Sequence, residues 1–353
     1  MVASEMVSRG AEGDSLLAPL RGHPVMWPLL CLVVLVGLNC ALTPHFASIE
    51  VRDGRLYGSV IDILRNGSIV MVLAIGMTVV IAVSGIDLSV GSVMALSGTV
   101  AAMVLVGAPG AGLWGAVAAA LGVAAVSGLL AGAMVTRLAL QPIVATLVLL
   151  VVGRGVAQVI SGGEKVRFES ASFERVFHGT VLGLPSALVL VVIVGAAVWV
   201  ALRFTVAGVS VAAVGGNIRA ARSCGLRADA VRVGAYVLSG LCAGIAGLVA
   251  AAEIKEADPA AAGMYLELDA IIAVVIGGTN LMGGRPVLIG SLVGAVLMQT
   301  LTVTMQMHNV PTEQGLIVKA GVAVVVCVLQ GERARDLWRL AFGARGETRV
   351  AGE

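Results

Sequence analysis

The chain has 353 residues, of which 58% are hydrophobic and only 12% carry a charged side chain. Its mean hydropathy is +1.00 and its net charge is +2. Soluble domains are about 25% charged, so this composition excludes an ordinary soluble protein and predicts an integral membrane protein. Aromatic residues make up only 4% of the chain, which favours a bundle of helices over an outer-membrane barrel. The five cysteines include no C-x-x-C pair and indicate no metal site.

Both ends of the chain are polar. Residues 1–25 carry three acidic side chains before the first apolar run, whereas a secretory signal begins basic and turns apolar at once. We therefore expect residues 1–25 to be a cytoplasmic tail and the first apolar segment to be retained as an anchor. Residues 331–353 are predicted to be a second cytoplasmic tail, with residues 26–330 forming one transmembrane domain.

Ten segments are apolar enough to be candidate spans, since about 20 apolar residues cross about 30 Å of hydrocarbon. With the N-terminus placed inside, fourteen Lys or Arg residues fall on the inner side and seven on the outer side, which predicts cytoplasmic termini. The eighth segment is short and ends in GGTNLMGG, so it is either a full crossing or re-entrant. The sequence thus predicts an all-α membrane protein with about ten transmembrane helices. In chain order the segments are 26–43, 67–84, 88–107, 113–136, 141–160, 182–202, 233–252, 268–283, 287–306 and 314–330.

Known catalytic motifs are missing from the sequence. It contains no G-x-x-x-x-G-K-[ST] loop for ATP and no H-E-x-x-H zinc motif. Asp87, Arg154 and Lys319 are the charged groups that the sequence offers for catalysis at membrane depth. Because these three residues are far apart in sequence and differ in kind, they do not indicate an enzyme.

Asp87 is the only formal charge in the 71 residues between Arg65 and Arg137. It lies in VSGIDLSVG, beside Gly85, Ser89 and Gly91, which indicates a broken helix. Two interpretations are open. Asp87 caps the helix that follows it, or it lies in a polar break that shapes a translocation path.

The stretch GGTNLMGG is similar to SGIDLSVG under the pattern G-x-[DN]-L-x-x-G. Gly278, Asn280 and Gly284 align with Gly85, Asp87 and Gly91, and Thr279 lies within the second stretch. Each stretch joins two apolar runs. Transporters often contain internal repeats with sites at broken helices, but chance similarity in a glycine-rich chain is the alternative.

The inner loop 205–231 contains VGGNIRAARSCGL, which predicts a two-turn helix from Ile218 to Cys224. Asn217 is a good N-cap and Gly225 a good C-terminal stop. So short a helix is marginal alone in water, so we expect it to dock on another protein; an ordinary positively charged inner loop is the alternative. The predicted docking residues are Asn217, Ile218, Arg219, Ala220, Arg222 and Gly225.

Three stretches together resemble the permease subunits of ribose-type ATP-binding-cassette sugar importers. They are GIDLSVGSVMALSG, AVGGNIRAARSCGL and AVVIGGTNLMGGRPVLIGSLVGA. Four further stretches resemble the galactofuranose-importer branch of that family, namely DGRLYGSVIDIL, VVGRGVAQ, YVLSGLCAGIAG and YLELDAIIAVVIGG. The resemblance covers about residues 35–330.

This resemblance implies a subunit of the bacterial inner membrane that binds no cofactor itself. ATP and Mg²⁺ are then bound by a cytoplasmic ATPase partner, which contacts residues 214–226. A second permease chain, either a related protein or a second copy, completes the pore, and a periplasmic protein delivers the sugar. We expect that protein to dock on the acidic outer loop 253–269, with Glu253, Glu256 and Asp258 as contacts.

The expected function is therefore import of a sugar, either a galactofuranose-like hexose or a pentose. A self-contained ion- or proton-coupled carrier is the main alternative, and a membrane scaffold is another. Such a carrier would be expected to have several intramembrane carboxylates. A neutral sugar calls for hydroxyl and amide groups along its path. The polar residues available are Asn66, Ser68, Thr78, Ser84, Ser89, Thr146, Gln158, Thr279, Asn280 and Gln299.

Overall fold

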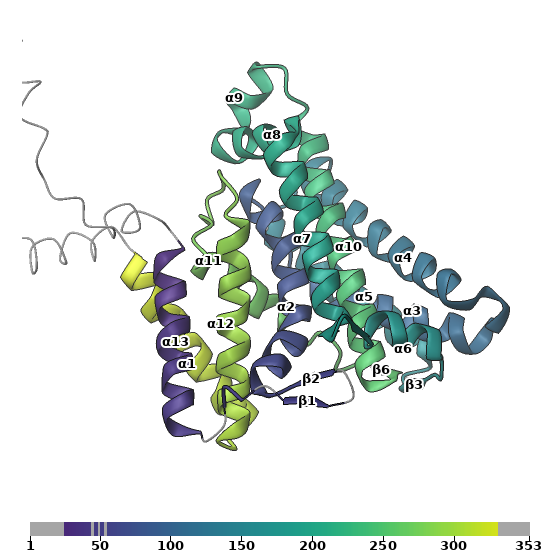
Figure 1. The fold of residues 1–353 in the computed structure, drawn as a ribbon. Coiled ribbons are helices and arrows are strands. Elements are labelled where there is room, and N and C mark those ends of the chain that lie inside the picture. Colours follow the sequence, from purple (N-terminus) through teal and green to yellow (C-terminus); the bar gives the residue numbers. More distant parts are fainter. Residues whose placement is uncertain (1–24, 44–45, 49, 53–54, 331–353) are drawn as a thin grey trace, which may run out of the picture.

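The computed structural model describes residues 25–43, 46–48, 50–52 and 55–330. The predicted tails, 1–25 and 331–353, lie outside these ranges apart from Val25. Within them the chain is a helical bundle with three pairs of very short strands, as the composition predicted (Figure 1). The helices are α1 (Met26–Leu42), α2 (Ser59–Ala82), α3 (Val90–Gly107), α4 (Gly112–Thr136), α5 (Pro142–Ser161), α6 (Ala171–Phe177), α7 (Ser186–Phe204), α8 (Val206–Gly216), α9 (Ile218–Ser223), α10 (Ala228–Ile254), α11 (Leu266–Ile276), α12 (Leu288–Met307) and α13 (Thr312–Gln330), with a 3₁₀ turn at Pro109–Ala111.

The strands form three antiparallel pairs. β1 (Glu50–Arg52) pairs with β2 (Arg55–Tyr57), β3 (Val166–Arg167) with β6 (Glu256–Ala257), and β4 (Thr180–Val181) with β5 (Leu184–Pro185). The labelled strands gather at one end of the bundle, and α8 and α9 lie at the other end (Figure 1). The loops 205–231 and 253–269 are therefore at opposite ends, as their predicted assignment to opposite membrane faces requires.

Seven of the described helices, α2, α3, α4, α5, α7, α10 and α12, are long and apolar enough to cross a membrane. The count of about ten spans therefore stays a prediction. The other three predicted spans correspond to α1 with 17 residues, α11 with 11 residues and α13 with 19 residues. At 1.5 Å per residue, α11 is only about 16 Å long, which is too short to cross the hydrocarbon as a helix.

α2 and α10 form the centre of the bundle. Nearly every α2 residue from Gly67 to Ala82 is buried, which explains why its sequence is apolar all round. α10 packs against α2, α3 and α4. Its approach to α4 is close: a Cβ atom at Gly240 would lie 2.4 Å from the carbonyl oxygen of Ala124. Small residues permit this backbone contact, as is typical of membrane helices.

α2 begins earlier than the sequence predicted. The predicted span started at residue 67, whereas the helix starts at Ser59 and includes Asp62 and Arg65. Its polar first turns follow the β1–β2 hairpin at the strand end of the bundle (Figure 1). The hydropathy pattern located the apolar part of this helix and missed its polar extension.

Candidate functional site: two helix breaks and the loops at either end

The predicted docking helix is present as α9. The Oδ1 atom of Asn217 accepts hydrogen bonds of 3.0 Å from the backbone N–H groups of both Arg219 and Ala220. At the other end, Gly225 is in the left-handed conformation, and its N–H donates to the carbonyl of Arg222. Both ends of α9 are thus capped by the residues that were predicted from the sequence.

The surface of α9 is basic and exposed. Arg219, Ala220 and Arg222 are exposed, and the Ala221 methyl group is buried against the bundle. Arg222 forms a 2.7 Å ion pair with Asp229 in the first turn of α10. Arg219 forms no ion pair with any residue that the structure describes, so its charge is available to a partner.

Asp87 lies in the bend between α2 and α3, and its residue surface is only 1% exposed. Its Oδ1 atom accepts hydrogen bonds from the N–H of Ser89 at 3.0 Å and from the Ser89 hydroxyl at 2.6 Å. Its Oδ2 atom accepts a 2.8 Å hydrogen bond from the hydroxyl of Ser239, on α10. Within the described chain it has no ion-pair partner. Three hydrogen bonds satisfy this buried carboxylate, so it both organises the local turn and ties the bend to α10.

The break itself is held by neighbouring helices. The carbonyl oxygen of Ile86 accepts a 3.3 Å hydrogen bond from the Thr146 hydroxyl on α5 and a 3.5 Å hydrogen bond from the Tyr236 hydroxyl on α10. Exposed backbone inside a membrane domain requires such internal partners. Thr146 was among the polar residues that were identified from the sequence for the sugar path, and Tyr236 was not.

The second break, residues 277–287, has the same local hydrogen bond as the first. The Oδ1 atom of Asn280 accepts from the N–H of Met282 at 2.9 Å, two residues later, as Asp87 does from Ser89. Thr279 accepts a 3.1 Å hydrogen bond from the N–H of Val287. The environments differ, because Asn280 is exposed and Asp87 is buried.

The two breaks touch each other. The N–H of Gly284 donates a 2.9 Å hydrogen bond to the carbonyl of Ala82 at the end of α2. The Ser84 hydroxyl donates at 2.8 Å to the carbonyl of Met282. The structure thus places together the two stretches that the sequence singled out as similar.

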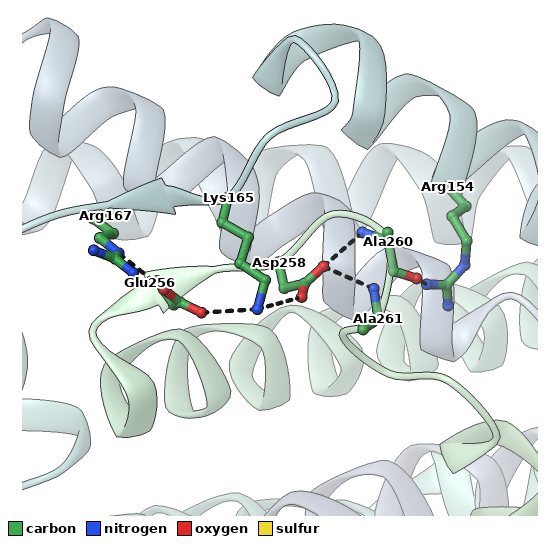
Figure 2. Close-up of polar contacts among 7 residues, drawn as sticks. All are labelled: Arg154, Lys165, Arg167, Glu256, Asp258, Ala260 and Ala261. Atoms are coloured by element: carbon green, nitrogen blue, oxygen red, sulfur yellow. Dashed lines mark hydrogen bonds and ion pairs between the residues drawn. The ribbon is translucent and has the colours of Figure 1, made fainter.

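The outer loop is acidic in sequence, but two of its predicted contacts, Glu256 and Asp258, are paired. Glu256 forms ion pairs with Lys165 at 3.1 Å and with Arg167 at 3.3 Å, and Asp258 forms one with Lys165 at 3.0 Å (Figure 2). Glu253, the third predicted contact, is partly buried in the last turn of α10. The sequence placed all these side chains on the outer side but gave no sign that they pair. The role of the carboxylates in docking stays a prediction.

The ion pairs shift the pKa values of the groups in this cluster. Hydrogen bonding and charge attraction from Lys165 lower the pKa of Glu256. Partial burial opposes the change at Asp258, but hydrogen bonds from Ala261, Lys165 and Ala260 outweigh it and lower its pKa. The same contacts raise the pKa of Lys165. All three groups are therefore held in their charged forms.

Two basic residues predicted to lie within spans have partners in the structure. Arg154, on α5, donates a hydrogen bond to the carbonyl of Ala260 in the outer loop (Figure 2). It donates a second hydrogen bond to the carbonyl of Ala262. Lys319, on α13, forms a 2.6 Å ion pair with Asp269 on α11, and both side chains are mostly buried. Charged groups at such positions are tolerated when they are paired in this way.

The chain matches known permeases over most of its length. Residues 59–327 match the family described as "Branched-chain amino acid transport system / permease component". The galactofuranose transporter permease protein YtfT of Escherichia coli is 44% identical, covering 87% of this chain and 91% of that protein.

Two further relatives have comparable coverage. The fructose import permease protein FruF of Bifidobacterium longum is 36% identical over 93% of both chains. The ribose import permease protein RbsC of E. coli is 37% identical over 86% of this chain and 93% of that protein. No solved structure matches the chain.

These matches agree with the resemblance seen in the three sequence stretches. Members of this family are transport subunits and not enzymes. The seven long apolar helices agree with a multi-pass protein of the bacterial inner membrane. The chain therefore belongs to the family of membrane permease components of ATP-binding-cassette importers, in the ribose-type group that includes the galactofuranose permease.

Proposed function

We propose that this permease imports a neutral sugar, with a galactofuranose-like hexose as the first candidate and a pentose as the second. The relatives are named for galactofuranose, fructose, ribose and arabinose. The identity is higher with the galactofuranose permease, at 44%, than with the ribose permease, at 37%. The higher identity is the reason for placing the galactofuranose-like hexose before the pentose.

Energy for transport comes from a separate ATPase that docks on α9, and ATP and Mg²⁺ are bound there and not by this chain. The observation that carries this proposal is the geometry of α9 itself. A helix of six residues is marginal in water, yet here Asn217 and Gly225 close both ends and Arg219 faces outward. A basic, exposed helix that is capped at both ends is suited to bind a partner protein and to transmit its movement.

The pathway lies along the two helix breaks, between this chain and a second permease subunit, either a related protein or a second copy. Residues 85–89 and 277–287 supply non-helical backbone together with serine, threonine and amide groups. Such groups can exchange hydrogen bonds with sugar hydroxyls without introducing charge. The buried, hydrogen-bonded state of Asp87 does not favour a proton-coupled carrier, which would require carboxylates that exchange protons along a path.

A periplasmic sugar-binding protein docks at the strand end of the bundle, on the outer loop that carries Glu256 and Asp258. Because both carboxylates are paired with Lys165, the surface available to the binding protein carries both negative and positive charge. Charge complementarity of this kind guides association and orientation more than it adds affinity.

The sugar is identified by uptake measurements. A strain that lacks its own pentose and hexose importers would express this chain with its ATPase, its binding protein and any second permease. Uptake of labelled galactofuranose, ribose, fructose and arabinose would be compared with competition by each unlabelled sugar. We expect galactofuranose to be taken up at the lowest concentration. Uptake of none of these sugars, with the complex assembled in the membrane, would contradict the proposal.

A further inference from the structure

Ser84 has an unusual backbone conformation at the end of α2. Its φ is +58°, in the left-handed region that favours glycine. The N–H of Ser84 donates to the carbonyl of Ile81, and the N–H of Gly85 donates to that of Val80. This pattern is a Schellman motif, in which glycine usually occupies the position that Ser84 holds here. A non-glycine residue in this position calls for a reason beyond ending the helix.

The Ser84 side chain provides that reason, because it bonds to two other segments. Its hydroxyl lies 3.0 Å from the carbonyl oxygen of Gly215 and 2.8 Å from that of Met282. A serine hydroxyl has a single hydrogen to donate, so the two carbonyls share it. Gly215 belongs to the last turn of α8, directly before the capped helix α9. Met282 lies in the second break, between α11 and α12.

The three segments are in close backbone contact around this hydroxyl. A Cβ atom at Gly215 would lie 1.7 Å from the carbonyl oxygen of Ala82, and one at Gly283 would lie 2.1 Å from Ser84 Oγ. The N–H of Gly284 also donates to Ala82 at 2.9 Å. There is no room for a side chain between the end of α2, the end of α8 and the second break. Displacement of any one segment must therefore move the others or break these hydrogen bonds.

We propose that Ser84 is a positioning residue for transport, because it transmits movement of α8 and α9 to the two helix breaks. This inference rests on the proposed docking of an ATPase at α9 and extends it by naming the route into the membrane. The shared hydrogen keeps the Gly215 and Met282 carbonyls aligned while α8 moves. Without it, α9 still receives the ATPase, but its movement is transferred less completely to residues 277–287.

Two substitutions separate this role from a purely structural one. Ser84→Gly removes the hydroxyl and suits the left-handed backbone, so it is expected to preserve folding. Ser84→Asn retains a hydrogen-bond donor, and asparagine tolerates this conformation. Ser127→Ala is the matched control, since the Ser127 hydroxyl bonds only to the Val123 carbonyl within α4 in the described structure. Each variant is purified with the ATPase, any second permease and the binding protein, and is reconstituted in liposomes.

The measured quantity is the number of sugar molecules imported per ATP hydrolysed, with basal hydrolysis measured separately. We expect Ser84→Gly to keep basal hydrolysis and membrane abundance but to lower this ratio about fivefold or more, the lower end of typical allosteric couplings. Ser84→Asn is expected to recover part of the ratio, and Ser127→Ala to leave it unchanged. An unchanged ratio in Ser84→Gly would overturn the inference. So would failure of Ser84→Gly to assemble, because the hydroxyl would then hold the fold.

The wild-type complex distinguishes this inference from the function on which it rests. If wild-type complex imports no sugar with ATP, the proposed function fails whatever Ser84 does. If wild-type import is coupled to ATP and Ser84→Gly matches it, only the role of Ser84 is wrong.

Discussion

The hydroxyl of Ser239, in the middle of α10, donates a 2.8 Å hydrogen bond to the Oδ2 atom of Asp87, in the bend between α2 and α3. The two residues are 152 positions apart in the sequence. This contact gives Asp87, the only charged residue between Arg65 and Arg137, a structural role. Asp87 shapes the start of α3 through Ser89 and fastens that bend to the central helix.

Replacement of Asp87 distinguishes a structural hydrogen-bond acceptor from a charge needed for transport. In Asp87→Asn, the amide oxygen can still accept from Ser89, and the Ser239 hydroxyl can turn to accept from the amide nitrogen. In Asp87→Ala, buried donors lose their acceptor, which costs about 1–3 kcal/mol of folding stability. We expect Asn to transport nearly as wild type and Ala to be reduced in membrane abundance. Uptake is compared at equal abundance, and near-complete loss in a well-expressed Asn variant would show that the charge takes part in transport.

Reversal of charge on α9 should uncouple transport without preventing insertion. Arg219→Glu with Arg222→Glu replaces a basic surface by an acidic one, and we expect sugar-stimulated ATP hydrolysis and uptake to fall about tenfold, equivalent to about 1.4 kcal/mol. Arg219→Glu alone is informative because it leaves the Arg222–Asp229 ion pair in place. Arg203→Glu, on the exposed surface at the end of α7, is the matched control. Survival of both activities in the double variant would remove α9 as the docking site.

Much of α9 was predictable from the sequence because its signals are local. Asn217 and Gly225 act within three residues of the backbone that they cap, so the pattern alone located the helix. The contact between Ser84 and Met282 spans 198 residues, and no local pattern predicts it. The same holds for Lys165 and Glu256, 91 residues apart. The distribution of Lys and Arg over the predicted loops placed both on the outer side, but only the fold brings the strands β3 and β6 together.

Neutralisation of the outer-loop carboxylates should weaken docking of the binding protein. We expect Glu256→Gln with Asp258→Asn to raise the concentration of binding protein needed for half-maximal uptake. The effect should shrink in high salt, because surface charges are screened over about 8 Å at physiological ionic strength. Lys165→Gln is the control for loop architecture, since it breaks the two ion pairs of Lys165, keeps the Arg167–Glu256 pair and leaves the carboxylates charged. If uptake depended on the concentration of binding protein as in wild type, the carboxylates of this loop would have no role in docking.

The ion pairs of the outer loop should respond to pH in a defined window. Partial burial opposes the change at Asp258, but hydrogen bonds from Ala261, Lys165 and Ala260 lower its pKa below the usual 3.8, so this contribution is complete above that pH and is lost as the pH falls through the lowered value. The pKa of Lys165 is raised above 10.5, so its contribution is lost only as the pH rises through that raised value. Hydrogen exchange of the Ala260 and Ala261 amides, corrected for the intrinsic rate, should therefore show constant protection near neutral pH and lose it in acid. In Lys165→Gln this loss should begin at higher pH; an identical profile in both proteins would contradict the assignment.

The source of energy is the most direct test of the whole account. Liposomes would contain this permease with its second subunit and the ATPase, with binding protein and labelled sugar outside and ATP or a non-hydrolysable analogue inside. The account predicts sugar accumulation that requires hydrolysable ATP and persists when a protonophore collapses the proton gradient. Accumulation without the ATPase, driven by an imposed proton gradient and abolished by the protonophore, would contradict it.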